Sequence, residues 1–190
     1  MGIEFGNTPE SWGIMAPNDP SDVPWGRCLD EIAEAGYQWV ELGPYGYLPT
    51  DPKALRAELD SRGLKLAAGV AMAPLEEPAA WPDLESQVLR TGELLAATGA
   101  RFLNLIDGVY SPSPPPETQP PDRLDVHAWG RLIETTERVV DMTREKFGLQ
   151  VAFHPCAETH VEYEDQIESL LDRTDPDRLS LCLDTGHHAY

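Results

Sequence analysis

The sequence predicts an α/β fold, a (β/α)8 TIM-type barrel that is incomplete, with about six βα units in 190 residues. Short apolar runs alternate with amphipathic helical patterns along the chain, and polar residues gather directly after the apolar runs. Such alternation is typical of a parallel sheet with right-handed crossovers. We expect one domain, residues 1–190, that stops before the last two units of a barrel.

Six apolar runs predict the strands, near Ile3–Phe5 and at Trp39–Leu42, Leu64–Val70, Phe102–Ile106, Gln150–Phe153 and Leu179–Leu183. Five amphipathic stretches predict the helices, at Trp25–Ala35, Asp51–Arg62, Leu84–Ala97, Ala128–Phe147 and Tyr163–Thr174. Gly36, Gly99 and Gly148 come just after three of these stretches, where helix C-caps favour glycine.

A doubly wound sheet is the alternative to a barrel. No Gly-x-Gly-x-x-Gly turn follows the first strand, which weakens the nucleotide-binding form of that alternative. Polar and glycine residues follow the strands at Glu41–Tyr45, His154-Pro155 and Asp184-Thr185. Because barrel enzymes carry their chemistry at the carboxyl ends of the strands, this placement favours the barrel.

The segment Ser111–Pro121 differs from the rest of the chain because six of its eleven residues are proline. It has too few N–H donors for a helix or a central strand. It follows one predicted strand and precedes a predicted helix, so we interpret it as a long loop over the active face rather than as a domain linker.

The charge is strongly negative, with 14 basic and 33 acidic residues and a net charge of −19. This field disfavours nucleic acid and anionic membranes as partners and attracts divalent cations to carboxylate clusters. Many of the acidic residues, such as Glu31, Glu34 and Glu58, fall on predicted solvated helix faces, where they serve solubility.

Neither a bilayer-spanning apolar run nor a secretory signal occurs in the sequence, so we expect a cytoplasmic protein. Its three cysteines form no Cys-x-x-Cys pair and are odd in number, which fits a reducing compartment. Cys28 and Cys182 lie in apolar settings typical of small core residues, whereas Cys156 lies in a polar stretch that is suited to line a site.

The motif Asp184-Thr185-Gly186-His187 directly follows the last apolar strand. Carboxylate and imidazole ligands suit divalent transition metals. With an Asp at the strand end, a His three residues later can reach the same carboxyl-terminal end of the barrel. The alternative is that Asp184 caps a following helix while His187 packs beneath it. The spacing alone does not separate these readings; the position at a strand end favours the metal.

A second cluster, His154–Glu162, follows the fifth strand and holds two histidines and two carboxylates in nine residues. Histidine serves as a ligand or proton shuttle, and a carboxylate as a ligand or base. The alternative is a polar loop that begins the next helix. That reading explains the acids but not His154 at the strand end.

Further polar and aromatic candidates come from the first half of the chain. Glu41, near the end of the second strand, is placed to bind a sugar hydroxyl or accept a proton, or to form a supporting salt bridge. Trp12 and Tyr45 are suited to wall a sugar ring, although aromatics more often belong to the core. Asn104 and Asp107 are candidates of low specificity.

Four motifs together carry a family resemblance: Thr8–Gly13, Ala35–Pro49, His154–Glu162 and Cys182–His187. In this order they resemble the sugar phosphate isomerase/epimerase group of xylose-isomerase-like TIM barrels, and within it the inosose dehydratase-type proteins. The resemblance implies a (β/α)8 barrel with one divalent metal ion (Mn, Co, Zn or Mg) at its carboxyl-terminal mouth. It also implies a small-molecule sugar or cyclic polyol substrate.

The resemblance also implies roles for individual residues. Asp184 matches the sixth-strand metal ligand and His187 the histidine that accompanies it. Glu162 is our choice for the fifth-strand ligand, with Glu158 and His154 as rivals, because His154 stands where many relatives have a strand-end Glu. The remaining roles that we expect are proton transfer by His154, Glu162 and His187, and substrate binding by Trp12, Glu41, Tyr45 and His160.

The implied reaction is proton abstraction beside a carbonyl followed by loss of water, as in a dehydratase lyase; the alternatives are a ketose isomerase or epimerase and a non-catalytic remnant. The related endonuclease barrels are disfavoured by the charge of −19 and the few histidines. Relatives take further His and Glu ligands from the seventh and eighth strands, which lie beyond Tyr190. We therefore expect half of a metal site, in a truncated chain or in a homo-oligomer that completes the sheet.

Overall fold

Two sheets carry the strands in the computed structural model, which describes residues 3–17, 19–110 and 123–189. The first has the order β1 (Gly6–Asn7), β2 (Trp39–Val40) and β3 (Lys65–Leu66), and both of its strand pairs are parallel. The second has the order β4 (Ala68–Ala73), β5 (Phe102–Asp107), β6 (Gln150–Phe153) and β7 (Leu179–Leu181). β6 and β7 pair in parallel, with Val151 opposite Leu179. Within each sheet, every strand therefore lies beside its neighbour in sequence, as repeated βα units require.

Among the described residues, five α-helices connect these strands: α1 (Trp25–Glu34), α2 (Pro52–Asp60), α3 (Trp81–Thr98), α4 (Val126–Phe147) and α5 (Glu164–Leu171). Three short 3-10 helices also occur, at Pro9–Trp12, Pro78–Ala80 and His187–Ala189. No helix in the described part of the chain is long and apolar enough to cross a membrane.

Local sequence signals set the ends of the helices. α2 begins after Asp51, whose side chain accepts a hydrogen bond from the backbone N of Ala54 at 2.8 Å. Asp125 caps α4 in the same way, accepting from the backbone N–H groups of His127 and Ala128. α4 ends at Gly148, whose φ of 67° is readily accessible to glycine but costly for other residues.

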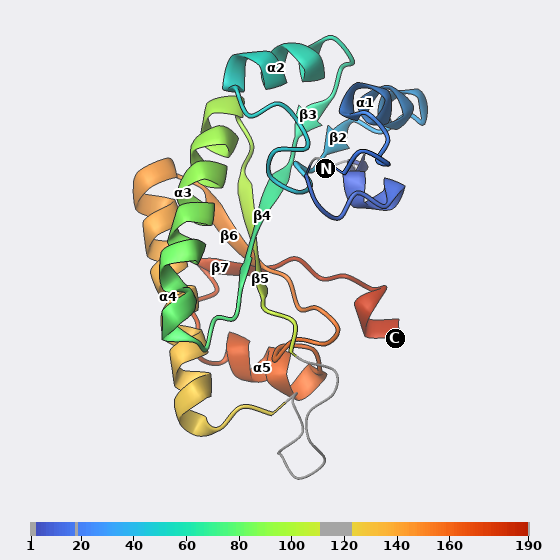
Figure 1. The fold of residues 1–190 in the computed structure, drawn as a ribbon. Coiled ribbons are helices and arrows are strands. Elements are labelled where there is room, and N and C mark those ends of the chain that lie inside the picture. The colour runs from blue at the N-terminus through green and yellow to red at the C-terminus, as the bar shows by residue number, and fades with distance from the viewer. Residues whose placement is uncertain (1–2, 18, 111–122, 190) are drawn as a thin grey trace. The chain divides into compact units, whose positions relative to one another are not determined.

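The chain divides into two compact units, one made of Met1–Val70 and Arg90–Leu103, the other of Ala71–Leu89 and Asn104–Tyr190. In the first unit, α2 lies against β3 (Figure 1). The apolar faces of α1 and α2 are buried there, together with Val40 and Leu66 of the sheet. Arg62 links the two helices, because its guanidinium pairs with Asp30 at 2.6 Å and with Glu58 at 2.6 Å.

In the second unit, α4 packs along β6 (Figure 1). Its buried face includes Leu132 and Val139, and Phe153 at the end of β6 is fully buried. The guanidinium of Arg138 on α4 lies over the ring of Trp81, 3.5 Å from its centroid, in a cation–π contact. This packing fixes β6, whose end carries the residues of greatest chemical interest.

The predicted order of strands and helices is confirmed, and β6 has the predicted bounds. Two strands differ. The run Leu64–Val70 divides at Ala67 into β3 and β4, which belong to different sheets. The first strand is Gly6–Asn7 rather than Ile3–Phe5, because Gly6 permits close approach to Trp39: a Cβ at Gly6 would lie 3.0 Å from the Cβ of Trp39. The predicted proline-rich loop Ser111–Pro121 lies outside the described residues, and the expectation of a single domain stays a prediction.

Two glycines of α4 give a matched stability test. We expect Gly148→Ala to destabilise the protein by about 1–2 kcal/mol, because alanine at a φ of 67° is strained. Gly130 is exposed, lies within the helix and has open space around an added Cβ, so Gly130→Ala should stabilise by about 0.5–1 kcal/mol. Urea denaturation of both variants measures the difference; equal midpoints would contradict this account of the helix end.

Candidate functional site

Backbone hydrogen bonds bring the ends of β5, β6 and β7 together in the second unit. The backbone N of His154, directly after β6, donates to the carbonyl of Leu105 in β5 at 2.9 Å. The backbone N of Cys182, directly after β7, donates to the carbonyl of Phe153 at 2.8 Å. The loops that leave β6 and β7 therefore begin side by side, as parallel pairing requires.

Three side chains from these loops form a group that we call the His–Cys cluster: His154, Cys156 and His187. One potential ligand atom from each lies within 4.8 Å of the others. The Sγ of Cys156 is 3.4 Å from the Nε2 of His187, and the two imidazole rings meet edge to face with centroids 5.3 Å apart. All three residues are half-buried, so a small ligand can reach them.

Asp184 stands beside this cluster and also organises the turn after β7. Its Oδ1 accepts hydrogen bonds from the backbone N of Gly186 at 2.6 Å and of His187 at 3.3 Å. Its Oδ2 lies 3.8 Å from the Nε2 of His187. Asp184 thus caps the 3-10 helix His187–Ala189, and its carboxylate also faces the imidazole; the metal-binding reading of the motif stays a prediction.

Electrostatics favours neutral imidazole and a charged carboxylate here. Burial lowers the pKa of His154, and the nearby His187 lowers it further, so His154 keeps a lone pair for a metal or a proton. Burial raises the pKa of the Cys156 thiol, reinforced by Asp184, Glu162 and Glu158. For Asp184, burial acts to raise the pKa, but the N–H groups of Gly186 and His187 outweigh it and the pKa is lowered.

A second, more deeply buried group, the Glu–Asp–His cluster, consists of Glu76, Asp107 and His160. Asp107, at the end of β5, accepts from the backbone N of Leu75 at 2.9 Å through Oδ1 and from the backbone N of His160 at 3.1 Å through Oδ2. Its Oδ2 also lies 2.8 Å from the Nδ1 of His160. Asp107 thereby joins the loop after β4 to the loop after β6.

Glu76 completes this cluster. Its Oε2 is buried, lies 3.7 Å from the Nδ1 of His160 and has no hydrogen-bond partner among the described residues. Burial raises the pKa of Glu76, and the charge of Asp107 raises it further. Sequence reasoning missed Glu76, although a carboxylate shortly after an apolar run is the signal that singled out Glu41.

Glu162 lies outside both of these clusters, although it belongs to the same loop. Its Oε2 accepts hydrogen bonds from the hydroxyl of Tyr110 at 3.0 Å and from the backbone N of Glu158 at 3.1 Å. Glu158 has a φ of 63°, and it has the only positive φ of a non-glycine residue in the described part of the chain. Glu162 therefore holds a strained turn in place. Among the rival fifth-strand ligands, the structure groups His154 with His187.

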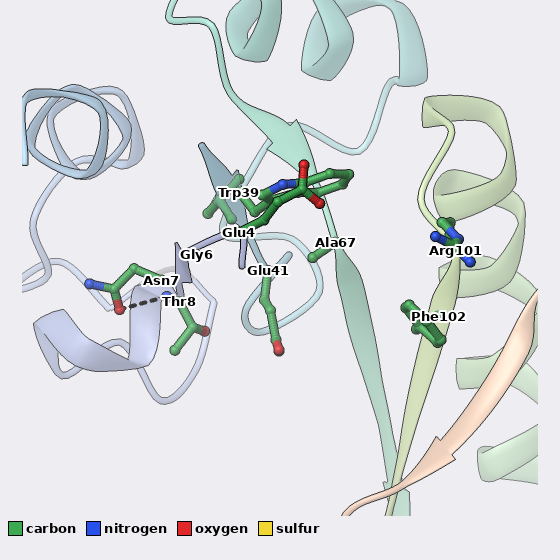
Figure 2. A pocket seen from close by; sticks show the side chains of 10 residues that line it. Glu4, Gly6, Asn7, Thr8, Trp39, Glu41, Ala67, Arg101 and Phe102 are labelled. Atoms are coloured by element: carbon green, nitrogen blue, oxygen red, sulfur yellow. Dashed lines mark hydrogen bonds between the residues drawn. The ribbon is translucent and has the colours of Figure 1, made fainter. Parts of the chain in front are cut away.

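The first unit contains the other predicted substrate contacts. Trp12 donates from Nε1 to Glu31 at 2.6 Å, and the ring of Tyr45 lies 5.0 Å from the guanidinium of Arg90. Glu41 lines a cavity of about 500 Å³ (Figure 2). The residues that line this cavity are Glu4, Gly6, Asn7, Thr8, Trp39, Val40, Glu41, Ala67, Arg101 and Phe102. The structure thus brings Glu41 to a cavity and engages Trp12 and Tyr45 elsewhere.

Parallel βα units with polar groups gathered at the carboxyl ends of the strands place the protein in the class of α/β barrels. A sequence model of one such family, the xylose isomerase-like TIM barrel, matches residues 29–190, and the chain belongs to that family. The fold class and the family resemblance expected from the sequence are confirmed.

Relatives and solved structures agree with this assignment. The chain is 31% identical to an inosose dehydratase of Lacticaseibacillus casei over 98% of its own length and 63% of that protein. It is 32% identical to the rhizopine catabolism protein MocC of Rhizobium meliloti, over 100% of the chain and 58% of that protein. It therefore spans about three-fifths of these relatives.

Two solved structures share the fold at low sequence identity. One is the IolI protein with a bound zinc atom, which has a TM-score of 0.74 and 13% identity over 97% of this chain and 64% of that one. The other is D-allulose 3-epimerase from Methylomonas sp., with a TM-score of 0.71 and 18% identity over 98% and 64%.

The raised pKa of Glu76 predicts a pH dependence of stability. The folded protein retains a proton that the unfolded chain releases above the ordinary pKa of 4.5, so this stabilisation is full below pH 4.5 and is lost as the pH rises through the raised folded value. As the pH rises from 4.5 through the raised pKa of Glu76, we expect the urea concentration at the unfolding midpoint of the wild type to decrease. The midpoint of Glu76→Gln should decrease less over the same pH range. The exposed neighbour Glu77 provides the control, since Glu77→Gln should retain the wild-type fall. Parallel curves for the wild type and Glu76→Gln would refute the assignment.

Proposed function

We propose that this chain carries part of the active site of a divalent-metal-dependent enzyme that acts on a sugar or cyclic polyol ketone, as in inosose dehydratase. The observation that carries the proposal is the convergence of His154, Cys156 and His187, with Asp184 beside them, at the ends of β6 and β7. The relatives named inosose dehydratase supply the reaction class.

The residues present fit a divalent ion. His154 and His187 offer imidazole nitrogens and Asp184 a carboxylate, a donor set suited to first-row transition metals. A bound ion would polarise the substrate carbonyl and stabilise enediolate charge. The lowered pKa of His154 leaves its imidazole neutral, which is the form that a ligand needs.

Proton removal beside the carbonyl requires a base on the same face. Glu162 is our candidate, because the hydroxyl of Tyr110 and the backbone N of Glu158 hold its carboxylate in place. A dehydratase then expels a β-hydroxyl, whereas an epimerase or isomerase returns the proton elsewhere. The family relationship favours the dehydratase through the curated relatives, and the solved epimerases make ketose epimerisation the second candidate.

The test combines metal analysis with two assays of the purified chain. We expect one divalent ion per chain and loss of water from an inosose; Asp184→Ala should lower metal affinity and turnover by about 100-fold. Asp177→Ala, at an exposed turn of the same unit, is the control and should leave both unchanged.

Three results would count against this function. Absence of stoichiometric metal would contradict the metal-dependent mechanism. Epimerisation of a ketose without loss of water from an inosose would select the second candidate. Bound metal with neither reaction would favour a non-catalytic barrel.

A further inference from the structure

We propose that Cys156 is itself a thiolate ligand of the metal ion, and that this ligand makes the site selective for Zn²⁺ and Co²⁺ over Mn²⁺ and Mg²⁺. The inference rests on the metal site of the proposed function and adds a donor and a class of metal. It starts from the position of the sulfur, which lies within 4.8 Å of a ring nitrogen of both His154 and His187.

The distances fit shared coordination. Around one tetrahedral ion with Zn–S of about 2.3 Å and Zn–N of about 2.0–2.1 Å, a sulfur and a nitrogen ligand lie about 3.5 Å apart. The Sγ of Cys156 is 3.4 Å from the Nε2 of His187 and 3.9 Å from its Nδ1. A ligand atom of His154 lies within 4.8 Å of both of these residues' ligand atoms. Small side-chain movements therefore suffice to close the group around an ion.

The backbone around Cys156 is fixed before any ion binds. The carbonyl of Cys156 accepts from the hydroxyl of the fully buried Thr159 at 2.8 Å and from its backbone N at 3.3 Å. The backbone N of Cys156 donates to the carbonyl of Val161 at 3.3 Å. This turn holds the sulfur toward His187 without the ordering cost that a loose loop would incur on binding.

The negative charges around Cys156 also favour a bound cation. Asp184, Glu162 and Glu158 all act electrostatically on Cys156. A thiolate and the carboxylate of Asp184 together match the two charges of a divalent ion, whereas the two imidazoles add none. Burial and these carboxylates keep the thiol protonated in the metal-free protein, so thiolate formation would accompany metal binding with release of a proton.

Donor softness then selects the metal. Thiolate and imidazole ligands suit Zn²⁺ and Co²⁺, while Mg²⁺ and Mn²⁺ prefer carboxylate, carbonyl and water oxygens. A site with two imidazoles, one thiolate and one carboxylate therefore favours the softer ions. With serine in place of Cys156, the site would keep its shape but lose this preference.

Cobalt provides a test that does not depend on turnover. The chain is stripped of metal with a chelator and titrated with Co²⁺, and the absorption spectrum is recorded. We expect the wild type to show a thiolate-to-cobalt charge-transfer band in the near ultraviolet. Cys156→Ser should lose that band and bind Zn²⁺ about 10–100-fold more weakly, with a smaller change for Mn²⁺. Cys182→Ser is the matched control, a half-buried cysteine of the same unit outside the cluster, and should retain the band.

The outcomes separate this inference from the function on which it rests. Cobalt that binds without the band, or a band that persists in Cys156→Ser, would overturn the role of Cys156. If Asp184→Ala still weakened metal binding by about 100-fold in that case, the proposed function would stand. Binding of Mn²⁺ or Mg²⁺ but of neither Co²⁺ nor Zn²⁺ would overturn only the role of Cys156, whereas a wild type that bound none of these four ions would contradict both proposals.

Discussion

The arrangement of the second unit depends on the hydrogen bonds that the buried carboxylate of Asp107 accepts. A fully buried carboxylate is costly unless it is hydrogen-bonded, and Asp107 receives the backbone N–H groups of Leu75 and His160 as well as the contact with the His160 imidazole. Leu75 follows β4 and His160 follows β6, so one side chain at the end of β5 fixes the loops on both sides. Charge-assisted hydrogen bonds of this kind contribute about 1.5–3 kcal/mol each, and their loss leaves a buried charge behind. The hydrogen bonds of Asp107 therefore help to fix the position of the loop that carries His154 and Cys156.

Parallel pairing provides the second constraint. The backbone bonds from His154 to Leu105 and from Cys182 to Phe153 align the exits of three successive strands. Residues 29 and 49 positions apart in sequence are thus brought together without a long loop. The carboxyl ends of parallel strands are where such a fold collects its polar groups, and both clusters lie there.

The sequence was sufficient for the order of elements because apolar periodicity and capping residues act locally. Gln150–Phe153 was predicted with its exact bounds, since a glycine-closed helix precedes it and a proline-containing loop follows it. The division of Leu64–Val70 at Ala67 was not predictable, because it depends on which sheet each half joins. The residues of the site were likewise predictable only where local sequence patterns, rather than contacts between distant segments, define them.

The motifs around His154 and Asp184 were visible as strand-end polar residues. Glu76 was missed because its significance comes from Asp107 and His160, which are distant in sequence. The hydrogen bonds that engage Glu162 with Tyr110 and Glu158 are likewise a property of the folded loop. Local sequence patterns thus indicate which loops carry the polar residues of the site. Which of the neighbouring acidic residues takes part in each cluster depends on packing between segments distant in sequence.

Exposure decides which of the two clusters is suited to chemistry. The side chains of Asp107 and His160 are 0% and 9% exposed, and their carboxylate–imidazole contact engages both groups inside the protein. The side chains of Asp184 and His187 are 42% and 34% exposed and remain open to a ligand. The buried cluster therefore supports the loops, whereas the His–Cys cluster, with Asp184 beside it, leaves its sulfur and nitrogen donors within reach of a ligand.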